Sequence, residues 1–309
     1  MTAPATERVA YFNGRIVPER EVRVPFRDRG FKFGDAAFDT TRTFGHRVFK
    51  LHEHLDRFYR SLRYLRIDPG LSLTRLAEIT EEVLRRNLPL LEPDEDYWVT
   101  QRVSRGLEAA DQGTWGQTGP TVIVECQPLP LRERAALYRD GIKVLVPSVR
   151  RVPPESLSPR AKTHNYLNVI VGDLEVKARD PEAWAILLDI RGNLAEGIGS
   201  NLFLVQGETV YTPHSQFVLG GISRETVIEL ARDAGIPVAE KDLDLFDAAQ
   251  ADEAFLTSTS LCICPVRSVN GLEIGGGRLP GPITRRLTEA YRNLVDFDFV
   301  AQYLKRLQT

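Results

Sequence analysis

The first part of the chain alternates short strand-like runs with turn residues. Residues 8–12 (RVAYF) precede Asn13-Gly14, a dipeptide that favours a tight hairpin turn, and Gly45-His46 separates two further runs. The strands expected in this part are 8–12, 15–17, 38–44, 48–51, 97–103 and 121–126. The pattern therefore predicts a sheet that includes two hairpins.

Two amphipathic helices are expected among these strands. Within residues 52–67, apolar side chains recur at intervals of three and four, which is the spacing of one helix face. These side chains are Leu55, Phe58, Leu62 and Leu65. A second helix is expected over 72–87, because Pro89 lacks the N–H that would continue it.

The remainder of the chain mixes strands and helices after an interruption at Pro128 and Pro130. The strands expected there are 142–146, 185–189, 202–205, 209–211 and 253–257, and the helices are 223–234 and 283–293. We predict a mixed α/β (α+β) protein. Its N-terminal domain is expected over 1–128, a linker over 129–139 and a C-terminal domain over 140–309.

Length and composition narrow the class of protein. A chain of 309 residues is about twice the ~150 residues of a common domain, which agrees with two domains. With 42% hydrophobic and 27% charged residues, the chain is not a long disordered one. The formal net charge of −2 and the absence of a basic region give no indication of a nucleic-acid partner. The longest apolar run, 183–188, is too short for a membrane span and no signal peptide is recognisable, so we expect a cytoplasmic protein.

The three cysteines indicate neither a disulfide framework nor a metal site. Cys262 and Cys264 are two residues apart, which in a strand places both on one face, and Cys126 is remote from them. Zinc sites show C-x-x-C pairs or histidines at matching spacing, and neither occurs here. We expect buried thiols in a reducing compartment and no metal. The sequence also lacks the Walker, G-x-G-x-x-G, H-E-x-x-H and G-x-S-x-G motifs.

Three segments carry residues suited to cofactor chemistry. They are 159–166 (PRAKTHNY), 194–201 (LAEGIGSN) and 219–226 (LGGISRET). Lys162 precedes a mostly apolar stretch, and a partly buried lysine is suited to Schiff-base chemistry. Glu196 stands in a glycine loop, where a carboxylate can meet a cationic ring nitrogen. The third segment runs into a helix at Ser223, whose first N–H groups can bind an anion. Taken singly, each segment also fits a structural role. The first fits a solvated lysine, the second an ordinary turn and the third a helix cap without a ligand.

Together, and in this order, the three segments resemble the class IV pyridoxal-phosphate aminotransferases. That family includes branched-chain aminotransferases, D-amino acid aminotransferases, (R)-selective amine transaminases and aminodeoxychorismate lyase. The same resemblance extends to 29–35 with Phe38-Asp39, 52–57 (HEHLDR), 251–260 (ADEAFLTSTS) and Pro265-Val266. It covers roughly residues 11–295. It implies a two-domain enzyme of fold type IV, similar to D-amino acid aminotransferase, with the cofactor between two α/β domains and a homodimer that completes each pocket.

The resemblance also implies roles for residues at matching positions. Lys162 would be the catalytic residue and form a Schiff base with pyridoxal 5′-phosphate, Glu196 would pair with the pyridine nitrogen, and Arg57 would hold the phosphate. The other cofactor contacts implied are Tyr166, Ile222, Ser223 and Thr259. Ping-pong kinetics follow, in which Lys162 moves a proton and a 2-oxo acid finally accepts the amino group.

Residues that differ between branches of the family give mixed indications of the substrate. The four-residue gap from Lys162 to Tyr166 resembles the D-amino acid and (R)-amine branches. Phe38 stands where the D-amino acid branch has tyrosine, and Phe33 stands where the branched-chain branch has one. Neither phenylalanine offers a hydroxyl group to a substrate carboxylate. The sequence therefore fits neither of these branches completely.

An apolar donor pocket is expected from the aromatic residues at these positions. The candidate substrate contacts are Phe33, Phe38, Trp98, Thr100, Arg102 and Ser260. Arg102 and Arg42 are candidates for binding a carboxylate, although each also fits an ion pair within the protein. We expect a transaminase for hydrophobic donors, either branched-chain-type amino acids or (R)-amines. The alternatives are a D-amino acid aminotransferase, an aminodeoxychorismate lyase that eliminates pyruvate, and a non-catalytic cofactor-binding protein.

Overall fold

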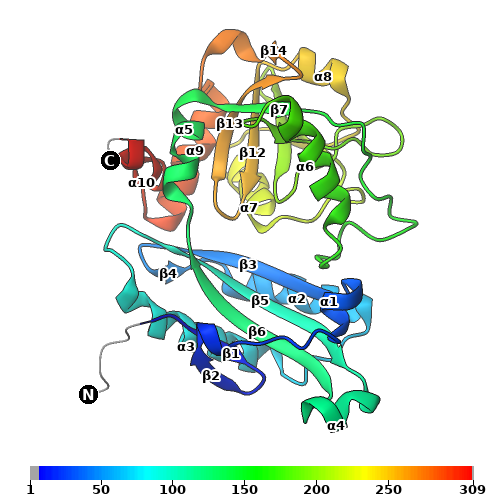
Figure 1. The fold of residues 1–309 in the computed structure, drawn as a ribbon. Coiled ribbons are helices and arrows are strands. Elements are labelled where there is room, and N and C mark those ends of the chain that lie inside the picture. Colours follow the sequence, from blue (N-terminus) through cyan, green and yellow to red (C-terminus); the bar gives the residue numbers. More distant parts are fainter. Residues whose placement is uncertain (1–6, 308–309) are drawn as a thin grey trace. The chain divides into compact units, whose positions relative to one another are not determined.

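The computed structural model describes residues 7–307, which form two compact units (Figure 1). Unit 1 consists of the chain up to Leu129 together with Ala161–Asn165, and unit 2 consists of Pro130–Arg160 and the chain from Tyr166 onward. The change of unit after Leu129 falls at the start of the expected linker. The return of a five-residue segment to unit 1 has no counterpart in the sequence pattern. The domain boundaries at 128 and 140 stay a prediction.

Unit 1 is built on a six-stranded sheet with the order β2-β1-β6-β5-β3-β4, in which the paired strands are antiparallel. The strands are β1 (Val9–Phe12), β2 (Arg15–Pro18), β3 (Ala36–Phe44), β4 (Arg47–Val48), β5 (Tyr97–Leu107) and β6 (Gly119–Pro128). The hairpin at Asn13-Gly14 is confirmed, and both of its turn residues have positive φ. The strand expected over 48–51 ends at Val48, because Lys50 takes a φ of 47° and a helix begins after it.

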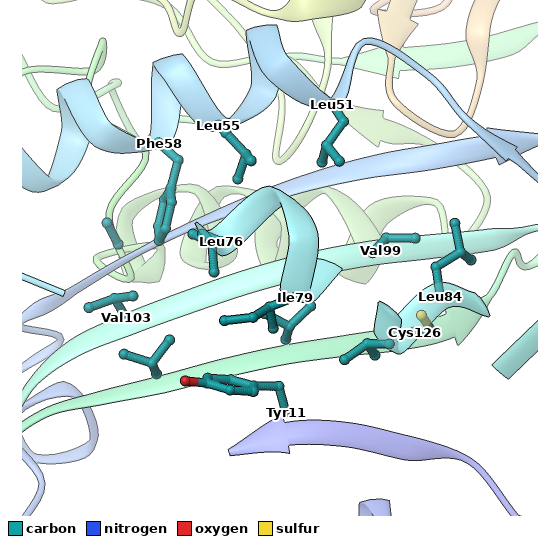
Figure 2. Close-up of a cluster of buried hydrophobic side chains, with 14 of the residues drawn as sticks. Tyr11, Leu51, Leu55, Phe58, Leu76, Ile79, Leu84, Val99, Val103 and Cys126 are labelled. Carbon is teal, nitrogen blue, oxygen red and sulfur yellow. The ribbon is translucent and has the colours of Figure 1, made fainter. Parts of the chain in front are cut away.

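Helices α2 (Leu51–Leu65) and α3 (Leu73–Asn87) cover one face of this sheet, where the core of unit 1 lies (Figure 2). Their apolar side chains meet those of the strands, which confirms both expected helices. The core side chains include Leu55, Phe58, Leu76, Ile79, Val99 and Val103. The other helical segments of unit 1 are α1 (Arg29–Phe33), α4 (Gln112–Trp115) and the 3-10 turns η1 (Glu19–Glu21), η2 (Leu88–Leu90) and η3 (Ala109–Asp111).

Unit 2 is built on an eight-stranded mixed sheet with the order β11-β10-β9-β12-β13-β7-β8, and β14 pairs with β13 outside this order. The strands are β7 (Ile142–Leu145), β8 (Trp184–Ala185), β9 (Asn201–Gln206), β10 (Thr209–Thr212), β11 (Val238–Glu240), β12 (Glu253–Ser258), β13 (Cys262–Val269) and β14 (Leu272–Glu273). The strand expected over 185–189 is cut short after Ala185. Ile186 N–H still donates to the carbonyl of Leu145 in β7, but Leu187 N–H donates to the carbonyl of Glu196 in a loop.

The helices of unit 2 include two that the sequence pattern predicts and four that it does not. They are α5 (Leu131–Asp140), α6 (Leu167–Arg179), α7 (Ile222–Asp233), α8 (Leu245–Ala249), α9 (Pro282–Val295) and α10 (Phe299–Leu304), with 3-10 turns η4 (Gly275–Gly277) and η5 (Lys305–Leu307). The predictions over 223–234 and 283–293 are confirmed as α7 and α9. The segment expected as a linker is mostly α5, because Leu131, Ala135 and Tyr138 share one buried helix face.

The three cysteines are buried, as expected, and none forms a disulfide within the described part of the chain. Burial raises the pKa of the Cys126 thiol to about 12, and it also raises that of Cys264 in β13. These thiols are therefore protonated and unreactive at neutral pH. No helix among residues 7–307 is long and apolar enough to cross a membrane.

Candidate active site

The candidate site residues fall into two sets, one in each unit, and each set is described by itself. Unit 1 holds Phe33, Phe38, Arg57, Trp98, Thr100, Arg102 and Lys162. Unit 2 holds Tyr166, Glu196, Ile222, Ser223, Thr259 and Ser260. Lys162 belongs to unit 1 because the short segment Ala161–Asn165 is part of that unit, whereas the residues on either side of the segment belong to unit 2.

Lys162 lies at the edge of strand β3, to which its backbone is bonded. Phe38 N–H donates to the carbonyl of Lys162 at 3.0 Å, and His164 N–H donates to the carbonyl of Ala36 at 2.9 Å. An isolated antiparallel bridge joins the intervening residues. The segment therefore extends the sheet of unit 1 by one short strand-like stretch, and the position of the lysine backbone is fixed by β3.

Helix α2 holds the same backbone from a second direction. The Ser61 hydroxyl accepts the N–H of Lys162 at 3.0 Å and donates to the carbonyl of Arg57, one turn earlier, also at 3.0 Å. Ser61 is itself buried. The helix that carries Arg57 is therefore bonded directly to the backbone of Lys162.

The amine of Lys162 lies over an aromatic ring. Its Nζ is 4.5 Å from the centroid of the Phe38 ring, and the guanidinium carbon of Arg102 is 5.4 Å from the same centroid. The His164 ring meets Phe38 edge to face at 5.5 Å. Burial lowers the pKa of His164 to about 4, with a smaller contribution from the cation of Arg102, so this imidazole is neutral at pH 7. The Phe38 ring is thus shared by the amine of Lys162, the cation of Arg102 and a neutral imidazole.

Arg57 belongs to a buried cluster with Asp39 of β3 and His54 of α2. Its Nε donates to Asp39 Oδ2 at 2.8 Å and its Nη2 to Oδ1 at 2.7 Å, while Nδ1 of His54 lies 2.7 Å from Oδ1. Burial alone would raise the pKa of Asp39, but the charge of Arg57 and the hydrogen bond from His54 outweigh it and hold that pKa well below its usual range. Burial lowers the pKa of His54 despite the neighbouring carboxylate. His54 is therefore a neutral imidazole whose Nδ1–H donates to Asp39.

In unit 2, Glu196 lies buried in the loop between β8 and β9. Its Oε1 accepts Nε of Arg151 at 2.9 Å, and its Oε2 accepts the N–H of Leu219 at 2.9 Å. The loop turns tightly at Gly197, where a Cβ would come within 2.6 Å of the Ser200 Oγ. One carboxylate is thus held in a fixed orientation by an arginine and by a backbone group of the third segment.

The third segment leads into α7, whose first residue is Ile222. No side chain caps this helix, and the Ser223 hydroxyl donates to the carbonyl of Ser258 at 3.1 Å. Thr259 follows directly, so the start of α7 and the end of β12 are neighbours. The buried Oγ1 of Thr257, on the same strand, has no hydrogen-bond partner among residues 7–307. Free helix N–H groups beside hydroxyl groups form a donor set that suits a phosphate.

The remaining candidate residues of unit 1 differ in their contacts and in their exposure. Arg102 donates its Nε to Glu125 at 2.8 Å, and the Thr100 hydroxyl meets that of Thr40 at 3.0 Å. Trp98 alternates with core residues of β5 and so shares the face of Thr100 and Arg102. Phe33 is 57% exposed on α1.

Three other residues are engaged inside their own unit. Arg42 is buried, donates to the carbonyl of Thr43, and lies 3.7 Å from Asp96. Ser260 is buried, and its carbonyl accepts the hydroxyl of Tyr303 at 2.9 Å. The partly buried ring of Tyr166 packs against the apolar cluster beneath α6. Arg42 therefore has an intramolecular ion-pair partner, the role that its sequence position also fitted.

The sequence gives no role to Asp39, His54 or Arg151, which the structure places against Arg57 and Glu196. His54 and Arg57 are three residues apart on one helix, so the periodicity does indicate that they share a face. Asp39 is 18 residues from Arg57, and Arg151 is 45 residues from Glu196. Pairs at such separations leave no local signal in a single sequence.

The mixed α/β fold and a comparison with known families together identify the class of protein. Residues 36–269 match the family model of the class IV amino-transferases. The chain belongs to this family of pyridoxal-phosphate-dependent aminotransferases, which act on amino acids and keto acids. Both the family and the fold class that the sequence predicts are thereby confirmed.

Two curated relatives and one solved structure show the range of the similarity. The chain is 35% identical over 287 residues to a putative branched-chain-amino-acid aminotransferase of Methanocaldococcus jannaschii, covering 92% of this chain and 95% of that protein. It is 30% identical over 286 residues to the D-alanine aminotransferase of Bacillus licheniformis, covering 92% and 96%. The crystal structure of the branched-chain amino acid aminotransferase of Escherichia coli aligns with a TM-score of 0.84 and 29% identity, covering 94% of this chain and 95% of that one.

Proposed function

We propose that this enzyme transfers an amino group from a hydrophobic donor to a 2-oxo acid by a ping-pong mechanism, through a Schiff base at Lys162. The donor is a branched-chain-type amino acid or an (R)-amine. The observation that carries the proposal is that Lys162 is half-buried, that its backbone is bonded to both β3 and α2, and that its Nζ lies over Phe38. A solvated surface lysine would have no such support.

The residues present fit pyridoxal phosphate by the chemistry of their donors and acceptors. When bound, pyridoxal phosphate supplies an electron sink that stabilises negative charge at the donor Cα. Arg57, the N–H groups of Ile222 and Ser223, and Thr259 are the proposed phosphate ligands. Glu196 is the proposed acceptor for the pyridine N–H, and its orientation is already set by Arg151. Tyr166 is proposed to lie beside the ring.

Lys162 is proposed to move the proton that transamination requires. Once the donor amine has displaced it, its Nζ would act as the base that takes the proton from the donor Cα and then as the acid that returns a proton while the amino group is transferred. The hydrogen bonds to β3 and α2 keep the lysine backbone still during this exchange, so only its side chain needs to move. His54, whose pKa is lowered by burial and, to a smaller extent, by the charge of Lys162, adds no competing positive charge near the amine.

A hydrophobic donor is favoured by the surroundings of the amine. Phe38 presents an apolar ring, and Trp98 lies on the same face of the sheet as Arg102. Arg102 is the proposed contact for a carboxylate, although Glu125 now engages it. The similarity to a putative branched-chain aminotransferase supports this reading. The similarity to a D-alanine aminotransferase supports a D-amino acid aminotransferase as the second candidate.

The first test is the Lys162→Ala variant, with Lys32→Ala as its control. Lys32 is a lysine of unit 1 whose Nζ also lies over an aromatic ring, that of Phe33. Lys162→Ala is expected to lose the visible absorbance of the bound cofactor and to lower transamination by at least ~100-fold, because it removes both the covalent attachment and the proton carrier. Lys32→Ala should keep both. An active, yellow Lys162→Ala protein would overturn the proposal.

The second test is a panel of donors supplied with 2-oxoglutarate. L-leucine, D-alanine and (R)-1-phenylethylamine separate the branches, and loss of donor with formation of glutamate is measured. Turnover of L-leucine or of the (R)-amine supports the proposal. Turnover of D-alanine alone would establish the D-amino acid alternative. Release of pyruvate from aminodeoxychorismate without any acceptor would establish the lyase.

We also propose that the enzyme is a cytoplasmic homodimer. The three buried thiols support a reducing compartment. Exposed apolar side chains along one stripe of α6 support a covered face in an assembly. The stripe consists of Leu167, Ile170, Val171 and Leu174.

A further inference from the structure

We propose that Asp39 is a positioning residue that sets the orientation of the Arg57 guanidinium for the cofactor phosphate. The inference rests on the proposed function, in which Arg57 binds that phosphate. It concerns affinity for the phosphorylated cofactor rather than the chemical step, so it can be measured on protein that is not turning over.

The geometry of the pair fixes the guanidinium in its plane. Two of its nitrogens, Nε and Nη2, donate to the two oxygens of Asp39 at 2.8 and 2.7 Å. Such a fork leaves the planar group one orientation, whereas a single hydrogen bond would allow it to rotate. The directions of all five N–H bonds of Arg57 are therefore decided by the carboxylate of Asp39.

The carboxylate is in turn held by groups other than Arg57. Its Oδ1 accepts the backbone N–H of Thr40 at 2.8 Å and faces Nδ1 of His54 at 2.7 Å. Asp39, His54 and Arg57 are at most 5% exposed. A buried carboxylate with this many donors is ionised, so it accepts hydrogen bonds and donates none. His54, neutral and donating, adds no further charge to the cluster.

Orientation, and not attraction, is what Asp39 contributes. A negative charge beside Arg57 weakens the pull of that arginine on a phosphate, so a purely electrostatic role for Asp39 predicts tighter phosphate binding when the charge is removed. The fork predicts the opposite, because an amide at position 39 would present N–H groups to the N–H groups of Arg57. The two possibilities therefore differ in sign.

The experiment titrates the apoprotein with pyridoxal 5′-phosphate and, separately, with pyridoxal, which has no phosphate. Dissociation constants come from the absorbance of the bound aldehyde. Asp39→Asn is expected to weaken the binding of pyridoxal phosphate by about 10- to 100-fold, because charge-assisted hydrogen bonds are lost. The binding of pyridoxal should weaken by less than about 3-fold. Combined with Arg57→Ala, the same substitution should no longer change the ratio of the two constants.

Asp96→Asn is the matched control. Asp96 is a second buried aspartate of unit 1, and it also faces a buried arginine of β3, Arg42, at 3.7 Å. It accepts the hydroxyl of Thr43 as well. Its substitution should lower the melting temperature of the apoprotein. It should change the dissociation constants of pyridoxal phosphate and of pyridoxal by the same factor. Melting curves of all variants show how much of each effect is loss of fold.

Equal weakening of both ligands by Asp39→Asn, or tighter binding of pyridoxal phosphate, would overturn the inference. So would an undiminished effect of Asp39→Asn in the Arg57→Ala background. Failure of the unsubstituted protein to bind pyridoxal phosphate would instead overturn the proposed function. The two failures are therefore distinguishable.

Discussion

At the scale of single residues, burial decides which charges the candidate site carries. His54 contacts Asp39 and His164 contacts Phe38, two neighbouring residues of β3 whose side chains point to opposite faces of the strand. Both imidazoles have a lowered pKa, and burial is the largest cause in each case. The charged groups that act on the two imidazoles include Asp39 and Arg57 at His54 and Arg102 at His164. A sequence shows five histidines without showing which of them are neutral.

A pH dependence of stability follows from His164. Its pKa is about 4 in the folded protein, against 6.5 for an exposed histidine, so the unfolded chain binds a proton between these values and the folded chain does not. The free energy of unfolding should therefore fall as pH drops from about 6.5 toward 4, by up to ~1.4 kcal/mol per pH unit from this residue.

Urea unfolding at several pH values, with and without His164→Phe, measures this contribution. The substitution should reduce the slope of the unfolding free energy against pH between about pH 4 and 6.5 and leave that slope unchanged above pH 7. His214, a histidine exposed on unit 2, serves as the control through His214→Phe. An unchanged slope in His164→Phe would show that the pKa of His164 is the same in the folded and unfolded chains and would contradict the prediction.

At the scale of elements, the start of α7 depends on glycine at one position and not at the next. A Cβ at Gly221 would lie 2.2 Å from Oδ1 of Asn201, whereas one at Gly220 would meet no atom within 4 Å. Asn201 also donates its Nδ2 to the carbonyl of Leu219 at 3.0 Å. The loop before α7 and the start of β9 are therefore packed together at Gly221, where the proposed phosphate ligands begin.

Gly221→Ala and Gly220→Ala form a matched pair of variants. Gly221→Ala should displace Asn201, lower the free energy of unfolding by ~1–3 kcal/mol and weaken pyridoxal phosphate binding, because the first N–H groups of α7 shift. Gly220→Ala should change stability by less than about 1 kcal/mol. Thermal unfolding and cofactor titration report the two effects, and equal behaviour of the two variants would contradict the packing argument.

At the scale of the whole molecule, α6 presents apolar side chains that the described residues of unit 2 leave exposed. Leu167 is 71% exposed and Leu174 is 63% exposed, on a helix whose opposite side is buried at Val169, Gly172 and Val176. An amphipathic helix in a monomer normally turns its apolar side inward only. This second apolar stripe is what supports the proposed homodimer.

Charged substitutions on this stripe test the assembly. Leu167→Glu and Leu174→Glu should convert the proposed dimer to a monomer, because each would bury an unpaired carboxylate in an apolar contact. Phe246→Glu, at an exposed aromatic residue of α8, is the control and should leave the mass unchanged. Light scattering coupled to size-exclusion chromatography gives the masses. A monomeric unsubstituted protein would contradict the proposal directly.

Local spacing in the sequence is enough to predict elements whose buried face repeats regularly. The helices around Phe58, Leu76 and Ile283 follow this rule, as does the hairpin at Asn13. The sequence pattern does not predict helix α5, because two prolines precede it and its buried face is narrow. The short strand β8 is misjudged because a buried apolar run does not show where pairing with a neighbour stops.

The sequence by itself determined the family, through ordered motifs around Lys162, Glu196 and Ser223, and most of the regular elements. Only the tertiary structure decided which side chains hold these residues. The fork from Arg57 to Asp39 and the contact of Arg151 with Glu196 join residues far apart in the chain. Local patterns arise from backbone geometry over a few residues, whereas such pairs depend on how strands and helices pack, which a single sequence does not encode at any fixed spacing.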